Sequence, residues 1–455
     1  MKYDEEKVFA YIDQHQQDYI NLLGRLCQQP SLAGTHTGID EMVKIVAEEL
    51  KNRGLEVTMC PTPGNPCLIA AMPGESNKVF GFYDHYDVQP VEPLEEWESD
   101  PWVLNIREGK MYARGVSDNK GGIAGSIAAV DAWLNTHGGL PCAVKFFIEG
   151  EEEIGSPSLP YFSKHYNDAM DCDGIIFEGG ERDSNSGTML LTYGVKGILY
   201  VELSCKNSAI DAHSSLAAIL ENPAERLVQA LSTLKDPVSG KILIDGFYDG
   251  IVPVTQQDLD ILKQDDFDEE AVKQYLGVDS FLKGMSGTQL LMNYHYEPTA
   301  NICGIESGYT GVGPKTVLPA SAFCKMDFRL VPGQVPDHIF TLLQEHFIKH
   351  GFNDIKVEKI IVEPPYRSAP SSDFCKAVAS AAERFSHKAP VIDYQTAGSC
   401  PLAYLCAERD IPAVMAGCGT QNNNIHAPNE FFAIEDFMDD IKFRCVMMHE
   451  LAGRN

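Results

Sequence analysis

The stretch Val79–Asp87, which reads VFGFYDHYD, joins an apolar run to a polar end. The run Val79–Tyr83 is rich in aromatic residues and predicts a buried strand, after which Asp84 and His85 follow directly. Similar apolar runs lie on either side of it, at Cys67–Ala71, Ala143–Ile148 and Asp173–Phe177. The apolar spacing of Gly122–Leu134 predicts a helix between two of these runs. Strands that alternate with helices predict an α/β fold with a mixed, mostly parallel sheet flanked by helices.

The middle of the chain follows a different order. Its pattern predicts βαββαβ, the ferredoxin-like α+β arrangement, over Gly197–Cys205, Pro223–Leu234, Thr299–Ile305, Ser321–Leu330, Asp337–Gly351 and Ile355–Val362. An acidic excursion, 236–298, interrupts this pattern, and its segment LKQDDFDEEAVKQYL (262–276) predicts an exposed helix. Because α/β patterning then returns, we predict a discontinuous first domain, 1–195 and 367–455, with an inserted domain over 196–366.

Composition narrows the classes of function. The chain has 455 residues, 44% of them hydrophobic, and its 36 basic and 65 acidic residues give a formal charge of −29. A surface this acidic repels the phosphates of nucleic acids and anionic lipids. We therefore expect that the protein binds neither nucleic acid nor a membrane surface. No apolar run reaches the roughly 18 residues of a membrane span. The start, MKYDEEKVFAYIDQ, lacks a signal-peptide layout, and the 13 cysteines form no CxxC pair. We therefore expect a cytoplasmic protein.

Acidic residues follow the predicted strands at the points where the strands end. Glu153 follows the run that ends at Ile148, Glu178 follows Phe177, and Asp118 precedes the helix that begins near Gly122. In a parallel sheet these positions converge beyond the carboxyl ends of the strands. Carboxylates that meet in one cleft need neutralising charge, which a pair of divalent cations supplies. Each motif is weak alone, because an acidic run such as EGEEE is more often a solvated surface.

The charges balance in a two-metal site. Asp118, Glu153 and Glu178 with one hydroxide carry four negative charges, which match two divalent cations, and His85 and His426 add ligands without charge. A mixed nitrogen and oxygen set suits Zn or Mn. Asp87, two residues after His85, is placed to fix the tautomer of that histidine.

At these residues the chain resembles the co-catalytic dimetal family of aminoacylases, carboxypeptidases and dipeptidases, most of all its cytosolic non-specific dipeptidase and carnosinase branch. The resemblance extends in family order over nearly the whole chain. The matching stretches are HYDVQPVEPLEEWESDPW (from His85), YARGVSDNKGG (from Tyr112), IEGEEEIGS (from Ile148), DGIIFEGG (from Asp173), YGVKG (from Tyr193), DAHSS (from Asp211), GYTGVGPKTVLPA (from Gly308), DFRLVP (from Asp327), AGSCP (from Ala397) and IHAPNE (from Ile425).

The resemblance implies two divalent metal ions, Zn or Mn, held by five residues. Its ligand sets are His85, Asp118 and Glu178 for one ion, and Asp118, Glu153 and His426 for the other. It further implies that Glu152 is the general base for a metal-bridged hydroxide, which attacks the amide bond of a dipeptide or short peptide. Asp87 completes the catalytic set implied for this domain.

The inserted domain is implied to act as a lid and as the surface of a homodimer. By resemblance, His213 stabilises the oxyanion, often from the partner subunit, and Arg329 grips the terminal carboxylate of the substrate. Thr316, Gly398 and Ser399 match further substrate contacts. The substrate expected is therefore a small peptide or an N-acyl amino acid.

Two positions depart from the dipeptidase pattern. Glu178 stands where dipeptidases carry aspartate and where carboxypeptidases and deacylases carry glutamate, so an N-acyl-amino-acid amidohydrolase or a carboxypeptidase is the alternative function. Asp84 stands where relatives carry glycine, and we expect its side chain to be solvated. A non-catalytic relative is disfavoured because Glu152 and all the ligands are present, and a dinucleotide-binding oxidoreductase because no GxGxxG opens a helix.

Overall fold

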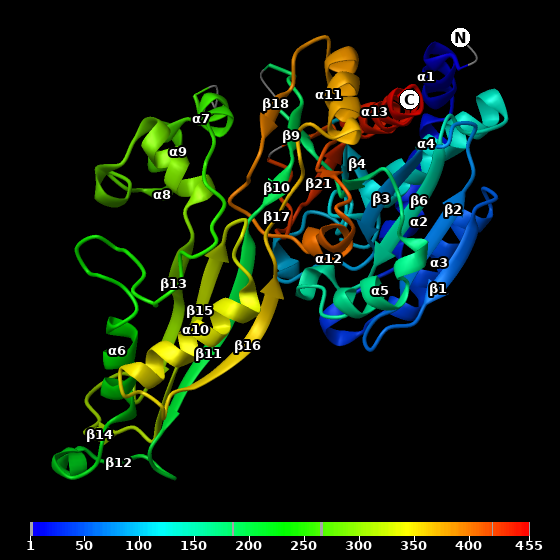
Figure 1. Ribbon diagram of the computed structural model, residues 1–455. Helices are drawn as coiled ribbons and strands as arrows, with labels where there is room; N and C mark the ends of the chain where they lie inside the picture. Colours follow the sequence, from blue (N-terminus) through cyan, green and yellow to red (C-terminus); the bar gives the residue numbers. More distant parts are fainter. Residues whose placement is uncertain (1–2, 184–185, 264–266, 421, 455) are drawn as a thin grey trace. The chain divides into compact units, whose positions relative to one another are not determined.

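The computed structural model describes residues 3–183, 186–263, 267–420 and 422–454 (Figure 1). The chain divides into two units. Unit 1 consists of Met1–Gly194, Arg367–Gln395 and Pro401–Asn455. Unit 2 consists of Val195–Tyr366 with the short segment Thr396–Cys400.

Unit 1 is built on a six-stranded sheet whose order is β1-β2-β6-β3-β7-β19. The strands are β1 (Glu56–Cys60), β2 (Cys67–Met72), β3 (Val79–His85), β6 (Ala143–Glu149), β7 (Gly174–Phe177) and β19 (Ala413–Val414). Strands β6, β3, β7 and β19 run parallel, whereas β1 and β2 pair antiparallel at one edge. The predicted mixed, mostly parallel sheet is confirmed. All four predicted runs are strands, and the two edge strands, β1 and β19, are additions.

Helices cover this sheet. They are α1 (Glu5–Gln14), α2 (Gln16–Gln28), α3 (Ile39–Lys51), α4 (Lys120–His137), α5 (Leu159–His165), α11 (Asp373–Ser386), α12 (Leu402–Cys406) and α13 (Ile434–Ala452). Helix α4 is apolar nearly all round, as expected of a helix buried on every side, and it packs against β3, α2 and α13. Its Gly122 permits close approach, because a Cβ there would lie 2.4 Å from Asp84 Oδ1.

Short ribbons complete unit 1. Strands β4 (Asn105–Arg107), β5 (Lys110–Tyr112) and β21 (Phe431–Ala433) form a three-stranded sheet in the order β21-β5-β4. This pairing brings the late segment before β21 back to the first half of the chain. Helices α1 and α13 also pack side by side, although they lie near opposite ends of the sequence (Figure 1).

Unit 2 contains an antiparallel sheet in the order β13-β15-β11-β16. Its strands are β11 (Gly197–Lys206), β13 (Thr299–Ser307), β15 (Ser321–Leu330) and β16 (Lys356–Glu363), and the helices α6 (Pro223–Ser232) and α10 (Pro336–Lys349) pack on them. Element order and strand order match the predicted ferredoxin-like arrangement. Alternate residues of β11, namely Leu199, Val201 and Leu203, enter the core.

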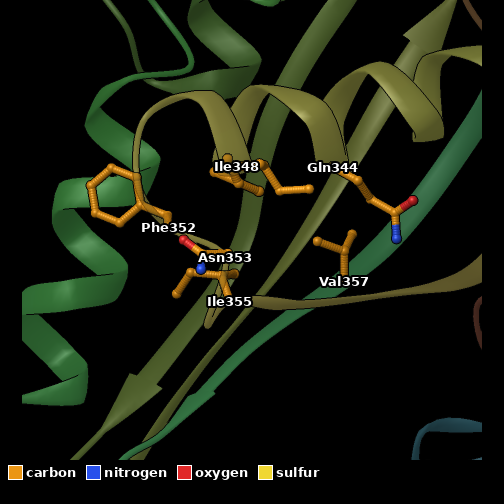
Figure 2. A pocket seen from close by; sticks show the side chains of 7 residues that line it. Gln344, Ile348, Phe352, Asn353, Ile355 and Val357 are labelled. Atoms are coloured by element: carbon orange, nitrogen blue, oxygen red, sulfur yellow. The ribbon is translucent and has the colours of Figure 1, made fainter.

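A pocket of about 260 Å³ lies between α10 and β16 (Figure 2). Its lining combines apolar side chains, among them Phe347, Phe352 and Ile355, with the amide side chains of Gln344 and Asn353. The side chains that line it come from the end of α10, from β16 and from the turn between them, so the pocket belongs to unit 2 alone.

The acidic excursion of unit 2 folds as small helices, α7 (Gln256–Leu262), α8 (Glu269–Leu276) and α9 (Gly287–Tyr296). The exposed helix predicted within 262–276 is confirmed over its second half, where α8 has no buried residue, but it does not extend back to Leu262, because α8 begins only at Glu269 with Asp268 as its N-cap. Residues 264–266 of that prediction lie outside the described part of the chain. Among the described residues, every helix is too short or too polar to span a lipid bilayer.

Candidate metal centre

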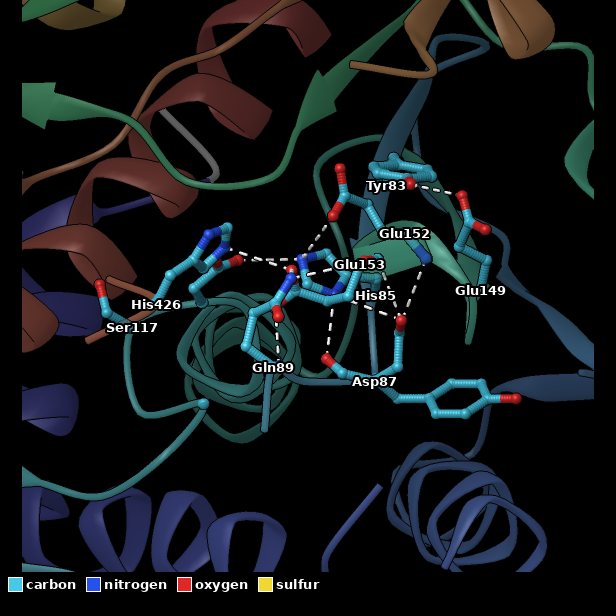
Figure 3. Close-up of polar contacts among 12 residues, drawn as sticks. Tyr83, His85, Asp87, Gln89, Ser117, Glu149, Glu152, Glu153 and His426 are labelled. Atoms are coloured by element: carbon cyan, nitrogen blue, oxygen red, sulfur yellow. Dashed lines mark hydrogen bonds and ion pairs between the residues drawn. The ribbon is translucent and has the colours of Figure 1, made fainter. Parts of the chain in front are cut away.

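The centre in unit 1 lies where the parallel strands end. His85 is the last residue of β3, Glu178 follows β7 directly, and Glu153 lies in a short 3₁₀ turn, Glu152–Ile154, just after β6. Asp118 precedes helix α4, and His426 lies in the loop before β21 (Figure 3). Because parallel strands present their carboxyl ends at one edge, five segments deliver polar side chains to one place.

Asp118 lies between two imidazoles. Its Oδ1 is 3.0 Å from His85 Nε2, and its Oδ2 is 2.9 Å from His426 Nε2. His426 Nε2 is also 3.2 Å from Glu153 Oε2. The ligand atoms of His85, Asp118 and Glu153 lie within 4.8 Å of one another, as do those of His85, Glu152 and Glu178. A carboxylate with one oxygen toward each histidine has the geometry of a bridge between two cations.

Asp87 orients both a histidine and a backbone turn. The Nδ1 atom of His85 is 3.1 Å from the Asp87 carbonyl oxygen and 3.5 Å from its Oδ1, so this nitrogen carries the hydrogen and Nε2 faces the centre. The Asp87 carboxylate also accepts the backbone N–H groups of Glu152 at 3.2 Å and Glu153 at 3.1 Å. Asp87 is fully buried. It therefore links the histidine to the turn that carries Glu152 and Glu153 (Figure 3).

Two of the five candidate ligands have left-handed backbone. Glu178 has φ +55° and His426 has φ +64°, a region that residues other than glycine rarely occupy. Such conformations cost of order 1–3 kcal/mol and persist where the surrounding structure imposes them. Their occurrence at two residues that face one centre indicates that side-chain position there outweighs backbone preference.

The electrostatics of the centre call for added positive charge. Burial raises the pKa of Glu178 to about 8, and burial with the neighbouring Glu178 charge raises the pKa of Glu152 well above its usual range. Burial also tends to raise the pKa of Asp118, but hydrogen bonds from His426 and His85 outweigh it and lower that pKa. Hydrogen bonds to Asp118 and Glu153 raise the pKa of His426 to about 10. Buried carboxylates in such proximity therefore need positive charge beside them, which divalent cations supply.

The donor set fits two divalent cations. The buried Oε1 of Glu178 has no hydrogen-bond partner among the described residues, and an acceptor of this kind is satisfied by a cation. Two imidazoles with three carboxylates form a mixed nitrogen and oxygen set, which suits Zn or Mn better than Mg. The residues predicted as ligands are therefore brought together in unit 1, and Glu152 lies beside them with its Oε2 4.0 Å from His85 Nε2.

The residues predicted to bind substrate all lie in unit 2, in two separate groups. At the end of β15, Arg329 Nη1 donates a hydrogen bond of 2.8 Å to Ser399 Oγ, and Gly398 accepts one of 2.9 Å from the backbone N–H of Lys196. The second group lies on the ribbon of β12 (Ala212–His213) and β14 (Val317–Leu318), where Thr316 Oγ1 is 3.5 Å from His213 Nε2. Thr316 is thus a neighbour of His213.

The two groups lie at opposite ends of the same strand. The β12–β14 ribbon adjoins the start of β15 at Ser321, whereas Arg329 is the residue before its last (Figure 1). At roughly 3.3 Å per residue, the strand spans about 30 Å. A dipeptide extends only about 7 Å. His213 and Arg329 of one subunit therefore cannot touch the same dipeptide.

Two features of the centre were not foreseen. Gln89 donates to Glu153 from its backbone nitrogen, 3.1 Å to Oε1, and from its side-chain amide, 2.8 Å to Oε2. It lies within the stretch HYDVQP, but an uncharged amide there gives no sign of its partner. The expectation that Asp84 is solvated is wrong, because it is fully buried, accepts a 3.1 Å hydrogen bond from Ser126, and has a pKa raised to about 7 by burial.

Comparisons with known proteins agree on one group of enzymes. Residues 81–450 match the family described as Peptidase family M20/M25/M40. The Beta-Ala-His dipeptidase of Rattus norvegicus is 31% identical over 390 residues, which cover 79% of this chain and 78% of that protein. The Cys-Gly metallodipeptidase dug1 of Schizosaccharomyces pombe (strain 972) is 26% identical over 488 residues, which cover 100% of this chain and 99% of that protein.

A solved structure gives the same result. The M20 family metallo-carboxypeptidase Sso-CP2 from Sulfolobus solfataricus superposes with a TM-score of 0.90 at 35% sequence identity. The superposition covers 95% of this chain and 99% of that protein. At this coverage the likeness includes residues of both units.

Proposed function

Because the chain belongs to peptidase family M20/M25/M40, we propose that it is a metal-dependent hydrolase that cleaves the amide bond of dipeptides. One observation carries the proposal, namely the convergence of His85, His426 and several carboxylates on Asp118 at the carboxyl edge of the sheet. The names of the curated relatives, which are dipeptidases, support this choice of substrate.

Two divalent ions, Zn or Mn, are the proposed cofactors. His85, Asp118 and Glu178 would hold one ion, and Asp118, Glu153 and His426 the other. When bound, the ions supply Lewis acidity, which lowers the pKa of a water molecule and polarises the scissile carbonyl group.

Glu152 is the proposed general base. Its carboxylate lies beside His85 and Glu178, whereas the carboxylate of the adjacent Glu153 faces His426. Burial and the neighbouring carboxylates raise the pKa of Glu152, which makes it a stronger base than an exposed glutamate. Its turn is fixed by the hydrogen bonds from the N–H groups of Glu152 and Glu153 to Asp87. Glu152 takes a proton from the attacking water and delivers it to the leaving amine.

Unit 2 supplies the proposed substrate contacts. Arg329 would bind the terminal carboxylate of the substrate, since a guanidinium matches a carboxylate with two parallel hydrogen bonds. Ser399 occupies one Arg329 nitrogen and so restricts the direction of the remaining donors. The backbone at Gly398 is fixed by Lys196 and lies beside this serine.

The enzyme is proposed to act as a homodimer joined through unit 2. His213 would stabilise the oxyanion, with Thr316 beside it, while Arg329 lies near the last residue of β15, at the other end of the strand. Because both groups cannot reach one dipeptide from one subunit, His213 is proposed to act on the substrate held by the partner subunit. The homodimer then becomes a condition for turnover.

A cytoplasmic location is proposed for the enzyme. Among the described residues no disulfide joins any of the 13 cysteines, and most of them are buried in the two units. A reducing compartment maintains cysteines in this state.

The substrate proposal is tested with a panel of free-amine dipeptides, N-acetyl and N-succinyl amino acids and longer peptides. Purified protein is assayed with Zn²⁺ or Mn²⁺, with and without a chelator. We expect chelator-sensitive cleavage that is fastest for dipeptides. Faster turnover of N-acyl amino acids, or stepwise release of carboxyl-terminal residues from longer peptides, would replace the dipeptidase proposal with the alternative indicated by Glu178.

A further inference from the structure

Glu430 forms a fully buried junction between two distant parts of unit 1. Its Oε2 accepts hydrogen bonds from Arg114 Nη1 at 2.7 Å and Gly115 N at 3.0 Å. Its Oε1 accepts the backbone N–H groups of Ser117 at 2.9 Å and Asp118 at 3.0 Å. Both oxygens thus accept two hydrogen bonds each, so this carboxylate has no capacity left for a metal ion.

The segment that contains Glu430 also carries His426. Phe431 N donates to the Asn423 carbonyl oxygen at 2.9 Å, which closes residues 423–431 into a loop with His426 near its tip. Asn429 ties the same loop to Glu96 and Glu98 by hydrogen bonds of 2.9 Å. His426 remains half exposed, so its position depends on the loop more than on packing around its ring.

We propose that Glu430 is a positioning residue that fixes Asp118 relative to His426 and thereby sets the affinity for the ion held by Asp118, Glu153 and His426. This inference rests on the proposed function, because it assigns a role toward the second of the two proposed ions. The backbone nitrogen of Asp118 itself donates the hydrogen bond of 3.0 Å, so Glu430 positions the residue that would contribute to holding both ions.

The effect should be larger at one ion than at the other. His85 is the last residue of β3, and Glu178 directly follows β7. The ladder between these two strands continues through a 2.9 Å hydrogen bond that the Glu178 N–H donates to the Tyr83 carbonyl oxygen. Glu430 makes no contribution to that ladder. His426, in contrast, reaches the centre only through the loop that Glu430 anchors. Hydrogen-bond partners of metal ligands typically change metal affinity by about 10–100-fold.

The test compares the full-length protein with E430Q and E430D. In E430Q, an amide N–H group replaces one of the carboxylate oxygens, each of which now accepts two hydrogen bonds. In E430D, the negative charge that pairs with Arg114 is kept, but the shorter side chain cannot reach all four of the present donors. D173N is the matched control, because Asp173 likewise accepts a backbone N–H, from Val79 at 2.7 Å, and pairs with a cation, Lys78 at 3.2 Å, at the opposite edge of the sheet.

Zn²⁺ binding is measured by calorimetry in a competing metal buffer, and Co²⁺ binding by its visible absorption bands. We expect two ions in the wild-type protein and D173N, and in E430Q and E430D at least tenfold weaker binding of the second ion with a smaller change at the first. If both Glu430 variants bind two ions like the wild type, or if D173N loses the second ion equally, the role of Glu430 is overturned. A wild-type protein that fails to bind two ions would instead overturn the proposed function on which this role rests.

Discussion

Gln89 holds both carboxylate oxygens of Glu153, Oε1 through its backbone nitrogen and Oε2 through its side-chain amide. The amide shares Oε2 with His426 Nε2, which lies 3.2 Å from the same atom. Gln89 therefore fixes the rotation of a carboxylate proposed to bind the second ion. A side chain in this relation to a ligand tunes affinity without touching the metal.

Substitution Q89A removes the side-chain bond and leaves the backbone bond in place. We expect about tenfold weaker binding of one of two Zn²⁺ ions, measured by calorimetry, because Glu153 gains rotational freedom. The exposed glutamine Gln17 provides the control, since Q17A removes an amide of equal size from the surface of α2. Unchanged binding of both ions in Q89A would show that the backbone bond alone orients Glu153.

Substitution E152Q should separate metal binding from turnover. Glu152 is not among the five proposed ligands, so we expect two bound ions together with a loss of about 10²–10⁴-fold in kcat, the range for removal of a general base. Elemental analysis and steady-state kinetics measure the two effects. The neighbouring Glu151 serves as control, because its carboxylate accepts the N–H groups of Asn65 and Ser158, away from the centre. An E152Q enzyme with full activity would remove Glu152 from the mechanism.

The homodimer proposal predicts complementation between two inactive variants. In a heterodimer of H213A and E152Q subunits, one site combines an intact Glu152 with the intact His213 of the partner subunit. Random mixing of subunits should therefore restore about a quarter of the wild-type activity. Activity is measured after the mixed variants exchange subunits, with each variant alone as control. A mixture that stays as inactive as its components would place His213 and Glu152 in the same subunit.

The buried carboxyl group of Glu363, at the end of β16, should make the free energy of unfolding depend on pH. Burial raises its pKa to about 7 from the ordinary 4.5, and the positive charge of Arg329 opposes this shift without cancelling it. Between these values the folded state keeps a proton that the unfolded state releases, so stability present below pH 4.5 is lost as the pH rises through 7. The shift corresponds to a loss on the order of 3 kcal/mol.

Substitution E363Q should abolish most of this loss. We expect the urea midpoint of the wild-type protein to fall between pH 5 and pH 8, and that of E363Q to change less. The control is E358Q, which alters an exposed glutamate of the same strand. An equal fall in the wild type and E363Q would assign the pH dependence to other groups.

The fold could be predicted where the sequence alternates clearly. Strand β15 begins and ends at the predicted residues, Ser321 and Leu330, because its buried and exposed positions alternate. The predicted run Val79–Tyr83 is extended to His85 in the structure, since ladder pairing continues beyond the apolar residues. In the acidic excursion the spacing of apolar residues does not mark where a helix begins. The structure begins α8 after Asp268, whose side chain caps the helix, although the sequence pattern continues back to Leu262.

The proposed ligands could be predicted because chemistry at strand ends follows from topology. To predict that His85 and Glu178 lie together, it was enough to recognise the ends of two parallel strands. The solvation of Asp84 was misjudged because a charged residue predicts exposure unless its partners are known, and Ser126 lies on another element. The roles of Gln89 and Glu430 could not be predicted, since both depend on contacts with residues distant in the sequence.

The order in which the ligands appear along the chain has a consequence for biosynthesis. His85, Asp118, Glu153 and Glu178 are translated early, whereas His426 follows about 250 residues after Glu178. The ribosome must make all of unit 2, including its short segment Thr396–Cys400, and much of the returning part of unit 1 before His426 emerges. Occupancy of the proposed second ion site would therefore be a late event in maturation, and a stalled or truncated nascent chain would present four of the proposed ligands without the fifth.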